Sequence, residues 1–117
     1  MYVLMFESID DLANYIKTYD IIINPKIAIK RTVEVENQIV ILNYYVTILD
    51  DKHNEVLGTY INYQIDLNEN ILLNNSFDSS EQDKFIVEYI FNLLKETKTT
   101  NNQDIQFIFN ASYVMTE

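Results

Sequence analysis

The sequence contains no cysteine and no tryptophan, and it has only one histidine, one glycine and one proline in 117 residues. Without cysteine the chain forms no disulfide and no thiolate metal site. A single glycine, Gly58, excludes glycine-rich phosphate loops and the Gly-Xaa-Ser-Xaa-Gly elbow of many hydrolases. The only histidine, His53, has no candidate nucleophile beside it. We therefore expect no enzymatic activity, no metal site and no cofactor.

Basic side chains are also scarce. Eight Lys and Arg residues face eighteen Asp and Glu residues, a formal net charge of -10, and the acidic excess is spread along the whole chain. Such a surface repels nucleic acids and anionic membranes, so we expect neither as a direct partner. The acidity either serves binding to a basic partner or serves solubility alone.

Long hydrophobic runs are missing as well, because no apolar stretch approaches the roughly 20 residues that cross a bilayer. The apolar start, residues 1–6, lacks the basic region of a signal peptide and is followed at once by Glu7, so it favours a first strand. These features predict a cytoplasmic protein.

What is present is enough apolar residues, 48%, for one folded domain spanning residues 1–117. The residue patterns predict strand, helix, three strands, helix and strand, in the order 1–6, 8–20, 26–36, 38–49, 56–67, 80–98 and 104–114. We expect an α+β fold, a mostly antiparallel sheet of four to five strands with two helices packed on one face.

Both predicted helices have a start signal and an apolar stripe. Ser8 is the expected N-cap of the first, with Asp11 completing a capping box; Ser79 or Ser80 caps the second. The stripe of the first helix comprises Ile9, Leu12, Ala13, Ile16 and Tyr19. The stripe of the second comprises Phe85, Ile86, Tyr89, Ile90, Leu93 and Leu94.

The three central strands alternate apolar and polar side chains. A turn at Glu36 and Asn37 joins the first two, and Arg31 interrupts the apolar face of the first. The inward residues of the second strand are Val40, Leu42, Tyr44, Val46 and Ile48. Those of the third are Leu57, Ile61, Tyr63, Ile65 and Leu67.

Two tyrosines, Tyr45 and Tyr60, are predicted on the opposite face of the sheet, beside Asn43, Asn62 and Gln64. Exposed tyrosine among amide side chains is typical of a protein-binding patch. The alternative is that a terminal strand or a loop covers both rings.

The acidic residues fall into three clusters. The strand pair is Glu34 and Glu36, whose side chains lie about 6.5–7 Å apart on one strand face. The hairpin tip is Asp50, Asp51 and Glu55, and the loop–helix group is Asp66, Glu69, Asp78 and Glu81. Carboxylates at such spacings can imitate a phosphate backbone; otherwise they are solvated faces and helix caps. Among the three we favour the hairpin tip, which protrudes and has few neighbouring cations.

Several segments resemble the small acidic anti-CRISPR proteins that bacteriophages direct against type II RNA-guided nucleases. The segments that carry the resemblance are Ile9-Asp-Asp-Leu12, Ile16-Lys17 with Asp20, and Lys84-Phe-Ile86. The predicted order of elements is also similar: a helix, a three-stranded antiparallel sheet and a following helical part. The chain departs from that pattern by its longer strands and by the strand predicted at 104–114. The resemblance implies acidic blocking of a nucleic-acid site.

Three functions remain open. The first is a non-enzymatic inhibitor, phage-encoded and acting in the bacterial cytoplasm as a monomer or homodimer, which mimics nucleic acid and binds the basic surface of a defence nuclease or nucleoprotein effector. The second is an immunity protein that neutralises a nuclease toxin. The third is a structural module that self-associates through residues 60–66 or through an unpaired strand edge.

Overall fold

Alternating apolar residues build a sheet, and two amphipathic helices cover it. The structure is a computed structural model that describes residues 2–19, 26–50, 52–66, 80–95 and 106–115. Its elements are β1 (Leu4–Phe6), α1 (Ile9–Thr18), β2 (Lys26–Glu36), β3 (Ile39–Leu49), β4 (Glu55–Asp66), α3 (Ser80–Lys95) and β5 (Gln106–Met115). The predicted order of elements is confirmed.

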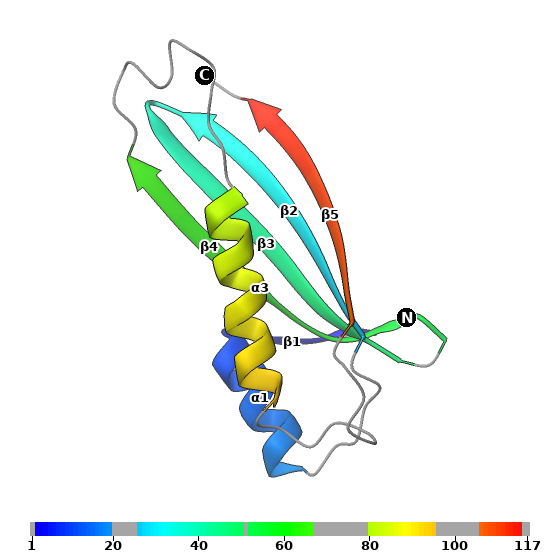
Figure 1. Cartoon of the computed structure of the whole chain (residues 1–117). Helices are drawn as coiled ribbons and strands as arrows, with labels where there is room; N and C mark the ends of the chain where they lie inside the picture. Colours follow the sequence, from blue (N-terminus) through cyan, green and yellow to red (C-terminus); the bar gives the residue numbers. More distant parts are fainter. Residues whose placement is uncertain (1, 20–25, 51, 67–79, 96–105, 116–117) are drawn as a thin grey trace.

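The sheet has five strands in the order β1-β4-β3-β2-β5 (Figure 1). Its long central pairings, β2 with β3 and β3 with β4, are antiparallel. Both edge strands join in parallel, β1 beside β4 and β5 beside β2. The α+β fold with a mostly antiparallel sheet is therefore confirmed, with parallel edges that local sequence patterns do not reveal.

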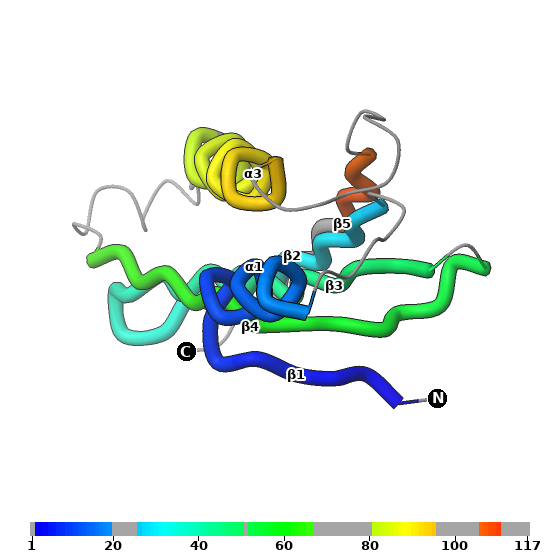
Figure 2. Tube along the Cα trace, turned by 90° about the horizontal axis from the view of Figure 1, so that it is seen from below, coloured from blue at the N-terminus to red at the C-terminus, as the bar shows by residue number. Residues whose placement is uncertain are grey.

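Both helices lie on the same side of the sheet, which we call the inner face (Figures 1 and 2). Leu12 and Ile16 of α1 and Ile90 of α3 are fully buried in one core with the inward residues of the sheet. All five inward residues predicted for β3 belong to that core, namely Val40, Leu42, Tyr44, Val46 and Ile48. The helices thus leave the opposite, outer face of the sheet uncovered by a helix, although Ala28, Thr47 and Leu49 on that face are buried.

Local signals set the element ends. The Ser8 hydroxyl accepts a hydrogen bond from the Asp11 backbone N–H at 3.0 Å, which confirms the predicted N-cap. The prediction that Tyr19 belongs to the apolar stripe of this helix is wrong. Tyr19 is the C-cap residue and is 67% exposed, because it lies past the last turn. The turn between β2 and β3 is centred on Asn37 and Gln38, one residue later than predicted, and both have positive φ, 51° and 65°.

Arg31, the one charge on the inner face of β2, explains how α3 docks on the sheet. Its guanidinium pairs with the Asp83 carboxylate of α3, and both side chains are largely buried. The Tyr44 hydroxyl of β3 donates a hydrogen bond to the same carboxylate at 2.6 Å. Arg31 also lies 6.0 Å from the ring centre of Phe109 in β5. One carboxylate therefore joins the helix to two neighbouring strands.

Candidate protein-binding face

The outer face of the sheet holds a row of aromatic and basic side chains on three adjacent strands. Tyr45 of β3 lies directly opposite Tyr60 of β4 and opposite Lys30 of β2. The two rings stack with centroids 4.7 Å apart, and the Lys30 ammonium lies 5.9 Å from the Tyr45 ring centre. Tyr60 is 57% exposed. Tyr45, beneath it in the stack, is half-buried, so Tyr60 is the ring that a partner would contact most.

Amide side chains continue the face beyond the tyrosines. Asn43 and Asn62 are directly opposite each other on β3 and β4, one step along from the tyrosine pair. Gln64 follows opposite Ile41. All are exposed or half-buried, so their donors and acceptors are available to a partner.

The strand register brings three carboxylates together at the far end of the same face. Glu36 and Asp66 lie on either side of Ile39, because both residues pair with it from neighbouring strands. Glu34 lies opposite Ile41, one step nearer the amides. With strands about 4.8 Å apart, the Glu36 and Asp66 backbones are roughly 10 Å from each other. From its position in the sequence, Asp66 is expected with the loop and helix; the fold places it beside the strand pair Glu34 and Glu36.

Two carboxylates of the hairpin tip, Asp50 and Glu55, accept hydrogen bonds from neighbouring groups of the protein. Asp50 accepts hydrogen bonds from the backbone N–H groups of Lys52 at 2.9 Å and Asn54 at 2.8 Å, where His53 has a φ of 64°. The bond from Asn54 is the main cause that lowers the pKa of Asp50. Glu55 accepts a hydrogen bond from the Thr47 hydroxyl at 2.8 Å. These contacts make the tip a weaker candidate than the far end of the outer face.

The remaining acidic candidates do not join the outer face. Glu81 lies in the first turn of α3, on the helix side of the sheet, and lines a cavity with Tyr63 and Phe85. Its charge there favours the positive end of the helix dipole. Asp51, Glu69 and Asp78, all candidates from the sequence, lie outside the described residues.

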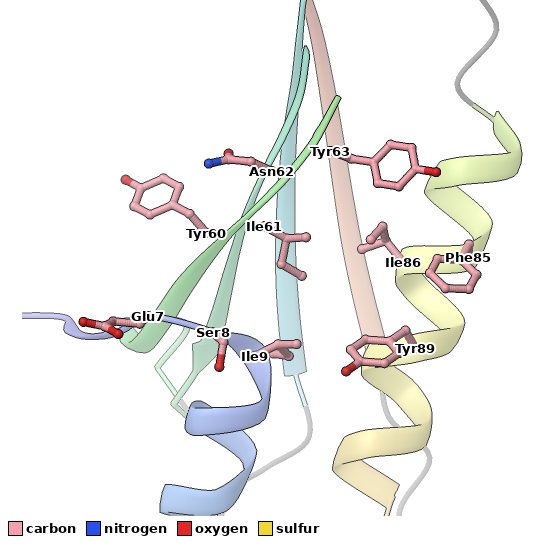
Figure 3. Close-up of a pocket in the computed structure, with 10 residues that line it drawn as sticks. All are labelled: Glu7, Ser8, Ile9, Tyr60, Ile61, Asn62, Tyr63, Phe85, Ile86 and Tyr89. Atoms are coloured by element: carbon pink, nitrogen blue, oxygen red, sulfur yellow. The ribbon is translucent and has the colours of Figure 1, made fainter. Parts of the chain in front are cut away.

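Three aromatic residues predicted to be inward are not in the core. Tyr63 of β4 is 45% exposed, and Phe85 and Tyr89 of α3 are 62% and 38% exposed. They line a cavity of about 350 Å³ between β4 and α3 (Figure 3). The prediction was wrong because α3 contributes Ile86, Ile90 and Leu94 to the core and turns its neighbouring flank away. Sequence periodicity does not tell how wide the covered stripe of a helix is.

Within the described part of the chain, no group of three or more His, Cys, Asp or Glu residues could hold a metal ion. In the same part, no helix is both long and apolar enough to cross a membrane.

No family model, curated protein or solved structure matches the chain. The case for a function therefore rests on the geometry of the molecule itself.

Proposed function

We propose that the protein is a non-enzymatic inhibitor that binds a basic, nucleic-acid-handling surface of another protein through the outer face of its sheet. The concrete case is an anti-CRISPR-like protein that occupies the nucleic-acid site of a bacterial defence nuclease in the cytoplasm. The observation that supports it is the convergence of Glu34, Glu36 and Asp66 with the Tyr45–Tyr60 pair on one open face.

The two parts of this face have different roles in the proposal. The stacked tyrosines offer a large, rigid apolar contact at a low cost in conformational entropy, as interface anchors do. The carboxylates at the far end steer a basic partner and fix its orientation, which mainly raises the association rate. Between them, the amides of Asn43 and Asn62 supply hydrogen bonds.

An immunity protein that neutralises a nuclease toxin is the second candidate, since the same face fits a basic nuclease of either origin. A self-assembling module is less well supported, because two copies of an acidic face repel each other. Only the self-assembling module requires a stable oligomer. Analytical sedimentation of the protein therefore separates this third function from the other two.

The proposal is tested by affinity capture from bacterial lysates, with captured proteins identified by mass spectrometry. We expect the wild type to capture basic nucleic-acid-binding proteins at low salt and to release them when salt or duplex DNA is added. Glu36→Gln/Asp66→Asn and, separately, Tyr60→Ala should abolish capture.

The matched control is Asp11→Asn/Glu88→Gln, which changes the net charge by the same amount with exposed residues of the two helices. It should capture the same proteins as the wild type. Equal loss of capture in both double variants would show that overall charge, rather than the outer face, is responsible, and would overturn the proposal.

A further inference from the structure

Within the part of the chain that the structure describes, strand β4 has an edge without a neighbouring strand over more than half of its length. The parallel strand β1 pairs only with Leu57, Gly58 and Thr59. From residue 60 to residue 66, β4 pairs with β3 on one side, and no described strand pairs with it on the other. Seven residues extend for roughly 20 Å at strand rise. Alternate residues of such an edge direct their N–H and C=O groups outward, where another extended chain can bind them.

The cavity of about 350 Å³ lined by Tyr63, Phe85 and Tyr89, which we call the aromatic cavity, lies directly along this edge. Figure 3 shows Tyr63 pointing toward α3, whereas Tyr60 points to the other side of the strand. Phe85, Ile86 and Tyr89 of α3 form the opposite wall. The Tyr89 hydroxyl donates to the Asp10 carboxylate with both oxygens at 3.0 Å, which ties this wall to α1. A strand added to β4 would therefore place every second side chain against an apolar surface.

The charge of the cavity indicates the chemistry of its occupant. The residues that line it and the adjoining cavity include Glu7 and Glu81 and no Lys, Arg or His. Asp66 lies at the end of the open edge, and Asp10 lies at the base of the wall. A basic chain would find carboxylates on both sides of the apolar surface, whereas an acidic chain would be repelled.

We propose that the open edge of β4 accepts an extended segment of a partner protein in which Lys or Arg residues alternate with apolar residues. Backbone hydrogen bonds along residues 60–66 supply the pairing, the cavity takes the apolar side chains, and the carboxylates select for basic ones. A second copy of this chain is the poorer occupant, because it would bring its own Asp66 and Glu81 to the same edge. The inference goes beyond the outer-face proposal and does not depend on it.

The test uses a fluorescein-labelled peptide of about nine residues, long enough to cover the edge, with alternating Lys and Val and a central Phe. We expect fluorescence anisotropy to show binding to the full chain, and amide hydrogen exchange to slow at residues 60–66 when the peptide is added. The same peptide with N-methylated backbone keeps charge and side chains but lacks donors, so its affinity should fall roughly tenfold or more. A peptide with Glu in place of Lys should not bind.

Matched variants locate the binding on α3. Phe85→Ala should weaken peptide binding about fivefold or more. The control Phe91→Ala, which alters an exposed phenylalanine outside the cavity, should leave peptide binding unchanged. Glu81→Gln should also weaken peptide binding, and its control Glu88→Gln should not. The outer-face variant Glu34→Gln/Glu36→Gln should bind the peptide normally, so failure of one proposal leaves the other measurable.

Three results would overturn the inference. One is equal binding of the Lys peptide and its N-methylated form, which would indicate charge attraction without strand pairing. Another is slow exchange in the free monomer at those amides of residues 60–66 that do not bond to β3, which would mean that the chain itself covers the edge. The third is a dimer that protects these amides, which would make a second copy the occupant.

Discussion

At the scale of single residues, the contact of Tyr44 with Asp83 has a measurable pH signature. Burial is the main cause that raises the pKa of Tyr44 above its ordinary value of 10.0, and the hydrogen bond to Asp83 raises it further. The folded protein thus holds the tyrosine proton more tightly than the unfolded chain does. The associated stability is complete below about pH 10 and is lost as the pH rises above that value.

We therefore expect Tyr44→Phe to lose less stability than the wild type between about pH 9 and pH 11. The measurement is the free energy of unfolding in urea at a series of alkaline pH values. Burial also raises the pKa of Tyr45, and the bond to Asp10 raises that of Tyr89, so some alkaline dependence remains in the variant. If the free energies of unfolding of the two proteins changed in parallel with pH, Tyr44 would make no contribution to the alkaline loss of stability.

At the scale of elements, α3 is held to the sheet by two different means. Ile86, Ile90 and Leu94 bury an apolar stripe, and Asp83 forms the charged contact with Arg31 and Tyr44. The charged contact fixes which turn of the helix lies over which strands, whereas apolar packing alone tolerates sliding. The exposed flank with Phe85 and Tyr89 thereby faces the open edge of β4.

Asp83→Ala should consequently destabilise the fold by about 2–4 kcal/mol, because it leaves the largely buried Arg31 charge without its carboxylate. Urea unfolding followed by circular dichroism measures the loss. The control is Glu88→Ala on the same helix, which is exposed and should change stability by no more than about 0.5 kcal/mol. Equal stability of the two variants would refute the docking role of Asp83.

At the scale of the whole molecule, the net charge of -10 governs which partners can approach. The Lys30 ammonium is the only basic group in the described tyrosine row of the outer face, and it lies 3.9 Å from Glu55. The far end of that face carries carboxylates. We therefore expect this face to attract basic protein surfaces and to repel polyanions.

We accordingly expect no binding to duplex DNA, single-stranded DNA or RNA at physiological salt. A gel-shift assay up to micromolar protein provides the measurement, with lowered salt as a control in which a basic site would gain affinity steeply. Submicromolar binding to any of these nucleic acids would exclude mimicry as the mode of action.

The sequence by itself determined the elements and the two faces of the sheet. Side-chain alternation and the Ser8 cap depend on residues two to four positions apart, and such local rules correctly predicted the buried row of β3 and the shared face of Tyr45 and Tyr60. Only the tertiary structure decided the parallel edges, the meeting of Asp66 with Glu36, the Arg31–Asp83 contact and the exposure of Phe85. These depend on strand register and on how far a helix covers the sheet, which are set by contacts between residues distant in the chain.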